Sequence, residues 1–202
     1  MNNYAELVGK IVKEPEFDYE SHGKKYYMTV MHVERLSGVI DKIPLMIPED
    51  LMSEVLIEKR VYVSGQFSSY MVHYADRNRL LLYVFVNKIE QVDSPEDDNL
   101  LFLDGFICKE PILRENPNGR WICDLMIAVS RNNHKFSDYI PTIVWGRNAR
   151  YAGMLSIGTN VRLYGRIQSR EYQKIIDGQT YIKTAYEFSA SVIEVYNEDK
   201  DD

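Results

Sequence analysis

The sequence predicts an all-β protein made of two tandem five-stranded barrels, each with one short helix between its third and fourth strands. Three observations support this prediction: an internal repeat, an acidic irregular segment near the middle of the chain, and strand-like segments in the same order in each half. The chain has 202 residues, of which 45% are hydrophobic and 27% charged. This is the composition of a globular protein, and each half is long enough for a modest core.

The repeat consists of six short segments that recur in the same order. Lys13-Glu14-Pro15 returns 96 residues later as Lys109-Glu110-Pro111, and the spacing rises to 104 residues towards the C-terminus, as loop insertions would cause. The other matching pairs are Leu7-Val8-Gly9 with Leu103-Asp104-Gly105, Arg35 with Arg131, Asp41-Lys42-Ile43-Pro44 with Asp138-Tyr139-Ile140-Pro141, Val63-Ser64-Gly65 with Leu163-Tyr164-Gly165, and Ile89-Glu90 with Ile193-Glu194. Six matches in one order indicate a duplication.

The boundary between the copies falls in residues 93–99, where acids, Ser and Pro favour exposed irregular chain. We therefore predict a diverged first domain over residues 1–93, an acidic linker over 94–99, a second domain over 100–196 and a short acidic tail over 197–202.

In the second copy, the strand-like segments are rich in Val, Ile, Tyr, Phe and Thr and are bounded by turn residues. They cover residues 100–110, 121–130, 139–145, 160–172 and 179–196, with hairpin signals at Asn116-Pro117-Asn118-Gly119 and Asp177-Gly178. Residues 147–156 carry apolar side chains at helical spacing, and Gly158 suits the helix stop. In the first copy, residues 48–57 occupy the helix position. Three strands, a short helix and two more strands are the order of an OB-fold barrel.

The strand over residues 161–172 has an unusual outward face. Val161, Leu163, Gly165, Ile167 and Ser169 have one parity and are predicted to face the barrel interior, whereas the opposite parity carries Arg162, Tyr164, Arg166, Gln168, Arg170 and Tyr172. Arginines attract phosphates and aromatic rings stack on bases, so this ridge suits single-stranded nucleic acid. The alternative is an ordinary solvated strand face.

The strand over residues 138–145 is apolar on both faces, which predicts that one face meets the core and the other meets DNA or another subunit. On the second face, Tyr139 and Trp145 are candidates for base stacking; alternatively, Trp145 packs in a subunit interface or under the helix. The loop before this strand supplies Arg131, Lys135 and Phe136, which could close over DNA or form a solvated hairpin tip.

The first copy keeps Tyr62 and Tyr70 on the corresponding ridge but has no arginine there. Binding by this barrel would need other cations, such as Lys24, Lys25, Arg35, Arg77 and Arg79. A mainly structural first barrel fits the sequence equally well.

The charge distribution places the basic surface in the second half. The whole chain has a net charge of −6; residues 1–98 account for −6, residues 99–202 sum to 0, and without the acidic tail the second half is +3. Two cysteines, Cys108 and Cys123, predict neither a disulfide framework nor a metal cluster, and they suit a cytoplasmic setting. No secretory signal, HExxH, Gly-rich phosphate loop or GxSxG pattern is present, so we expect neither an enzyme nor a cofactor.

The second copy resembles the bacterial single-stranded DNA-binding protein (SSB) family. The resemblance covers about residues 99–196 and rests on Leu103-Asp104-Gly105, Glu110-Pro111, Asn118-Gly119, Ile127-Ala128-Val129, the run from Asp138 through Trp145-Gly146-Arg147 to Ala149, and Tyr164-Gly165-Arg166 through Tyr172. The first copy is similar to the family only at Gly9, Glu14-Pro15, Ile43-Pro44 and Gly65.

The resemblance implies single-stranded DNA binding in replication, recombination or repair, with Tyr139, Trp145 and Tyr172 where the family places base-stacking aromatics. Asn133 stands where a further aromatic often sits, so that contact is missing or is supplied by Phe136. Because the family usually works with four OB domains, two per chain imply a homodimer. The tail lacks the family's apolar tip, which argues against recruiting replication or repair enzymes through it. The alternative is an OB-fold protein-interaction or primosomal accessory module with weak or no DNA binding.

Overall fold

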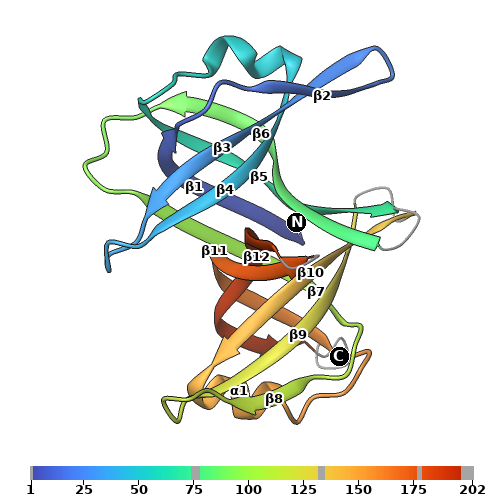
Figure 1. Ribbon diagram of the computed structural model, residues 1–202. Coiled ribbons are helices and arrows are strands. Elements are labelled where there is room, and N and C mark those ends of the chain that lie inside the picture. Colours follow the sequence, from blue (N-terminus) through green and yellow to red (C-terminus); the bar gives the residue numbers. More distant parts are fainter. Residues whose placement is uncertain (1, 74–77, 132–134, 177–178, 197–202) are drawn as a thin grey trace.

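The computed structural model describes residues 2–73, 78–131, 135–176 and 179–196. Figure 1 shows two β-barrels, one from each half of the chain, which meet at their first strands. The predicted hairpin turn at Asp177-Gly178 and the acidic tail over 197–202 lie outside the described residues. No helix in the described segments is long and apolar enough to cross a membrane.

The two barrels have the same order of elements. The first contains β1 (Asn3–Ile11), β2 (Glu16–Ser21), β3 (Lys24–Glu34), β4 (Ile40–Pro48), the 3₁₀ helix η1 (Glu49–Glu54), β5 (Arg60–His73) and β6 (Asn78–Gln91). The second contains β7 (Asp98–Ile107), β8 (Ile112–Glu115), β9 (Trp121–Ser130), β10 (Ser137–Trp145), the helix α1 (Gly146–Ala152), β11 (Asn160–Ile176) and β12 (Gln179–Val195).

The predicted all-β architecture is confirmed, and each helix lies between the third and fourth strands of its barrel when β1–β2 and β7–β8 are each counted as one interrupted strand. Three details differ. The predicted strand over 100–110 ends at Ile107 and resumes as β8, because Pro111 has no N–H for the ladder. The helix of the first barrel is a 3₁₀ helix, and α1 ends at Ala152, earlier than predicted. Strand β7 begins at Asp98, inside the predicted linker.

The barrels are joined through a continuous sheet. Its order is β2-β3-β4-β6-β5-β1-β7-β11-β12-β10-β9-β8, with β3–β1 and β7–β9 pairings that close each barrel. In the antiparallel β1–β7 ladder, Ala5 pairs with Leu101, which is its equivalent in the repeat. An approximate two-fold axis therefore passes between these two residues and relates the barrels.

The glycines of the repeat lie where strands cross closely. A Cβ on Gly105 would lie 2.6 Å from the carbonyl oxygen of Ala128, and a Cβ on Gly9 would collide with the carbonyl oxygen of His32 in the same way. Directly after these glycines, β1 pairs with β3 and β7 pairs with β9, and these pairings close each barrel. One hydrophobic cluster runs through both barrels and includes Leu7, Leu103 and Phe188.

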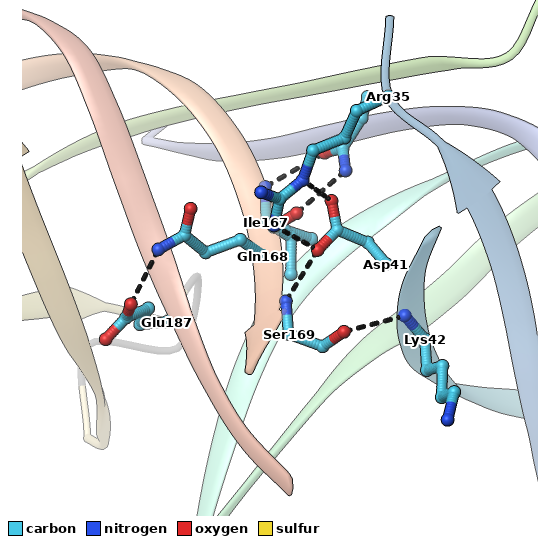
Figure 2. Close-up of polar contacts among 8 residues, drawn as sticks. Arg35, Asp41, Lys42, Ile167, Gln168, Ser169 and Glu187 are labelled. Atoms are coloured by element: carbon cyan, nitrogen blue, oxygen red, sulfur yellow. Dashed lines mark hydrogen bonds and ion pairs between the residues drawn. The ribbon is translucent and has the colours of Figure 1, made fainter. Parts of the chain in front are cut away.

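Two equivalent polar clusters tie the barrels together near the axis. In the first, drawn in Figure 2, the Arg35 guanidinium donates to both oxygens of buried Asp41 at 2.6 and 2.7 Å. Asp41 Oδ1 also accepts the backbone N–H of Ser169 from the second barrel at 2.7 Å, and Ser169 Oγ accepts the N–H of Lys42 at 2.8 Å. An exposed ion pair between Lys42 and Glu171 lies beside this cluster.

The second cluster repeats this pattern from the other side of the axis. Arg131 donates to both oxygens of Asp138 at 2.8 and 3.1 Å, and Asp138 Oδ1 accepts the N–H of Ser69 from the first barrel at 2.6 Å. Ser69 Oγ accepts the N–H of Tyr139 at 2.8 Å. The recurrence of Arg35 and Asp41 as Arg131 and Asp138 thus corresponds to a repeated contact between the barrels.

Candidate nucleic-acid interface

Strand β10 presents two aromatic rings to solvent on the outer surface of the second barrel. Tyr139 and Trp145 are 48% and 39% exposed, whereas Ile140 and Val144, of the opposite parity, are fully buried. Ile143 has the outer parity but is buried, so the exposed rings stand near the two ends of the strand. In the single chain, Trp145 is therefore exposed rather than packed beneath α1.

One cation of the predicted set accompanies Trp145. Arg147 lies in the first turn of α1, two residues after Trp145, and is exposed. Arg150, one turn further, is placed over the ring of Trp121 at 5.1 Å from the ring centre. Trp121 is partly buried and packs against the hydrophobic cluster. Of the two tryptophans, Trp145 is therefore the more accessible for stacking.

Strand β11 carries the predicted ridge in two parts rather than as one continuous row. Gln168, in the middle, is buried and donates to Glu187 at 2.6 Å. The first barrel approaches here: partial desolvation and then the nearby Arg35 guanidinium lower the pKa of Arg166. The exposed members of the ridge are Tyr164, Arg166, Arg170 and Tyr172.

The two ends of the ridge differ in their surroundings. At the start of β11, Arg162 donates to Asp104 at 3.0 Å and lies 3.8 Å from the ring centre of Tyr196, so its guanidinium already has protein partners. At the far end, the guanidinium of Arg170 lies 5.9 Å from the ring centre of Tyr172, and both side chains are exposed. The far end is therefore the more accessible to a nucleic acid.

The predicted loop before β10 is described only in part. Phe136 and Lys135 are exposed, whereas Arg131 is bound to Asp138 and also donates to the Ser69 carbonyl at 2.7 Å. Arg131 therefore links the second barrel to the first. Asn133 and Arg77 lie outside the described residues.

Near the two-fold axis, the outer surface of the joining sheet is aromatic. Tyr4 and Tyr62 both donate to Glu6 Oε1, at 2.6 and 2.5 Å, and Phe102 lies against Tyr164 with ring centres 4.9 Å apart. The hydrogen bonds from Tyr4 and then Tyr62 lower the pKa of Glu6. Tyr62 is therefore engaged in this sheet, whereas Tyr70, the other tyrosine of its predicted ridge, is 60% exposed.

A groove of about 850 Å³ lies between the barrels and was not predicted from the sequence. It is lined by residues of both halves, which include Tyr19, Tyr70, Tyr83 and Arg79 from the first and Arg131 and Tyr172 from the second. Tyr70 and Arg79 were recognised as possible contacts, but nothing in the sequence indicates that the β5–β6 hairpin extends across to β10.

The duplication shows how the first barrel differs. Leu45 on β4 pairs with Val84 on β6, and Thr142 on β10 pairs with Phe188 on β12 in the corresponding parallel ladder of the second barrel. Strand β4 therefore matches β10 at a spacing of 97 residues. Gly65 and Gly165 stand at equivalent bulges, so β5 matches β11 at a spacing of 100. The first-barrel residues equivalent to Tyr139, Trp145 and Tyr172 are consequently Lys42, Pro48 and Val72. None of these three residues carries an aromatic ring, whereas Tyr70, at the position equivalent to Arg170, is an exposed ring of the first barrel.

Within the described residues, no group of three or more His, Cys, Asp or Glu side chains is arranged to hold a metal ion.

Comparisons with known proteins agree with this architecture. The wild-type single-stranded DNA-binding protein from Thermus aquaticus matches 99% of this chain and 95% of its own with a TM-score of 0.78 at 16% identity. A deletion mutant of that protein gives a TM-score of 0.75 at 17% identity, with 98% of this chain and 95% of the mutant covered. At this identity the likeness shows the fold, and it extends over both barrels.

The family match lies in the second barrel. The single-strand binding protein family model matches residues 98–195. Single-stranded DNA-binding protein 1 of Clostridium acetobutylicum is 33% identical over 91 residues, which cover 42% of this chain and 83% of that protein. Single-stranded DNA-binding protein A of Bacillus subtilis is 28% identical over 105 residues, or 49% of this chain and 61% of that protein. The chain thus spans less than two thirds of the Bacillus relative. With these matches and the OB-barrel fold, the chain belongs to the bacterial single-stranded DNA-binding protein family.

Proposed function

We propose that this protein binds single-stranded DNA largely without regard to sequence, and that it does so mainly with its second barrel. The observation that carries the proposal is the exposure of three aromatic rings, Tyr139, Trp145 and Tyr172, on the outer sides of β10 and β11. Exposed arginines accompany them at positions 147, 166 and 170. Rings that stack on bases and cations that contact phosphates are the combination that single strands require.

The other predicted contacts are secondary in this proposal. Lys135 and Phe136 are exposed shortly before Tyr139 in the chain, and Tyr164 and Arg162 lie at the end of β11 nearest the joining sheet. Arg131 contributes charge while it remains bound to Asp138. We infer a non-catalytic role on DNA exposed during replication, recombination or repair in the cytoplasm, where the protein would associate with the nucleoid.

The two tryptophans allow a direct test. In Trp121→Phe, oligo(dT) should still quench the fluorescence of Trp145; in Trp145→Phe, the remaining signal from Trp121 should change little. Trp145→Ala should weaken binding of a labelled oligo(dT) by about 1–3 kcal/mol, the usual contribution of one stacked base, as measured by fluorescence anisotropy. Quenching that follows Trp121 instead would remove β10 from the site.

Salt provides the second part of this test. Arg170→Gln should reduce the dependence of log K on log salt by about 0.7, the value expected when one phosphate of a single strand is no longer neutralised. If the unaltered protein shows no binding at roughly 50 mM salt, where release of counterions favours association, DNA binding is excluded. A protein-interaction or primosomal accessory role would then be the better explanation.

We also propose that two chains associate through the outer face of the joining sheet, to give four OB domains. This face carries the tyrosine pair at Glu6 and the exposed apolar side chains of Leu100 and Val192. A contiguous apolar and aromatic surface is typical of a subunit interface, and a two-fold contact would bury it against itself. Light scattering should give twice the chain mass, and Leu100→Glu should shift it to one chain with an unchanged circular dichroism spectrum. A monomeric unaltered protein at micromolar concentration would refute this assembly.

A further inference from the structure

The groove between the barrels combines aromatic rings and cations from both halves of the chain. Resting on the proposed function, we propose that this groove binds a segment of the same DNA strand, so that the path continues from the second barrel onto Tyr70 and Arg79 of the first. This assigns the first barrel a direct contact with DNA, through residues that are not equivalent to the stacking positions of the second barrel.

The charge of the groove differs from that of the chain. The chain has a net charge of −6, yet among the described residues that line the groove there are four Lys or Arg and one acid, Asp18. Two of the cations, Arg79 and Arg131, come from different barrels. A cationic surface on an acidic protein is expected where a polyanion binds, because the remaining surface repels it.

Rings of each barrel share the groove with cations of the other barrel. Burial raises the pKa of Tyr83 to about 12, and Arg131 of the second barrel opposes this shift. Burial also raises the pKa of Tyr186, and Lys42 and Arg79 of the first barrel oppose that shift. Both phenols therefore stay neutral at physiological pH, and Arg79 and Arg131 line the same groove as these two rings. Uncharged rings next to cations are the arrangement that holds single strands.

The groove is continuous with the site on the second barrel. Tyr172, one of the three exposed stacking rings, lines the groove, and so does Pro141, which lies two residues after Tyr139 on the same side of β10. A strand stacked on Tyr139 and Tyr172 would therefore enter the groove at its next nucleotides. In the groove it would also meet Tyr70 of the first barrel, an aromatic side chain that is 60% exposed.

The test compares substitutions in the groove with matched substitutions elsewhere. Tyr70→Ala and Arg79→Gln remove an exposed ring and an exposed cation of the first barrel. Tyr151→Ala removes another exposed ring, on α1, which is 41% exposed and does not line the groove. Lys59→Gln removes a cation just before β5, roughly 35 Å from Tyr70 along the strand at 3.3 Å per residue.

Affinity for oligo(dT) of two lengths separates the groove from the site on the second barrel. A strand of about 8 nucleotides is within the range that one OB barrel accommodates, whereas one of roughly 30 should also reach the groove. We expect Tyr70→Ala to weaken binding of the longer strand about 5- to 150-fold and to leave the shorter one within about twofold. Arg79→Gln should lower the salt slope for the longer strand by about 0.7, and both control variants should bind like the unaltered protein.

Photocrosslinking of the unaltered protein provides a measurement that needs no variant. Oligonucleotides that carry 5-iododeoxyuridine should crosslink to peptides containing Tyr70 or Tyr19 as well as to those containing Tyr139, Trp145 or Tyr172. Crosslinks confined to the second barrel, or equal affinity of Tyr70→Ala and Tyr151→Ala for the longer strand, would overturn the groove proposal and leave the proposed function intact. Failure of the unaltered protein to bind either length would refute both.

Discussion

The two Arg–Asp clusters between the barrels predict large and unequal losses of stability. Asp41 is completely buried and accepts bonds of 2.6–2.7 Å from Arg35 and from the Ser169 N–H. In Asp41→Ala, the Ser169 N–H would lack its acceptor, at a cost of about 1–3 kcal/mol. Arg35 would lose its counter-charge, and breaking a buried pair costs about 3–5 kcal/mol in total when one partner stays behind.

The exposure of each arginine decides how much of this cost is realised. The side chain of Arg35 is 22% exposed and that of Arg131 is 37% exposed, so water can solvate the second guanidinium more readily after its aspartate is removed. We therefore expect Asp41→Ala to lower the free energy of unfolding by about 3–5 kcal/mol, and Asp138→Ala by about 2–4 kcal/mol. Urea denaturation followed by far-ultraviolet circular dichroism measures both.

Two further variants test the physical reasoning. Lys42→Met removes an ion pair that also joins the barrels but is exposed on both sides, and it should leave the urea midpoint unchanged. The double variant Arg35→Met/Asp41→Leu removes both buried charges and should be clearly more stable than Asp41→Ala, because no charge is left unpaired. If Asp41→Ala matches Lys42→Met, or if the double variant is no better than Asp41→Ala, the attribution to an unpaired buried charge is wrong.

Two other predictions concern titratable groups. The hydroxyls of Tyr4 and Tyr62 hold the pKa of Glu6 below its usual value. The Glu6 carboxylate therefore stabilises the fold above about pH 4.3, and this stabilisation is lost as pH falls through the lowered pKa. The difference in unfolding free energy between the unaltered protein and Glu6→Gln should shrink between pH 5 and pH 3, and a constant difference would contradict this. Burial of Cys123 raises its pKa to about 11, whereas Cys108 is partly exposed. Ellman's reagent at pH 8 should therefore label Cys108 before Cys123. Simultaneous labelling of both thiols would show that the second barrel opens readily.

The repeat and the alternation of side chains predicted most of the fold. The duplicated Lys-Glu-Pro and Leu-x-Gly segments located the two barrels, because they mark a strand interruption and a close crossing that each barrel needs. The 3₁₀ form of η1 and the early end of α1 were not predicted, because a helix of one or two turns depends on its tertiary surroundings more than on its own propensity.

The candidate site was predicted strand by strand but not in three dimensions. Alternation correctly placed Tyr139 and Trp145 on the outer side of β10, since parity is a local property. It could not show that Gln168 is buried where the first barrel approaches β11, nor that Tyr70 and Tyr172 line one groove. Both facts depend on how the barrels are oriented, and that orientation is set by the β1–β7 ladder and the Arg–Asp clusters.

The pairing at the approximate two-fold axis has a consequence for what sequences this arrangement can accept. When two identical subunits meet along a two-fold axis, a residue on the axis must face its own copy, so small faces small or large faces large. Here Ala5 faces Leu101, and both are fully buried. A covalently linked pair can therefore match a small side chain with a large one at its centre and adjust each side separately, a choice that a symmetric dimer of single barrels does not have.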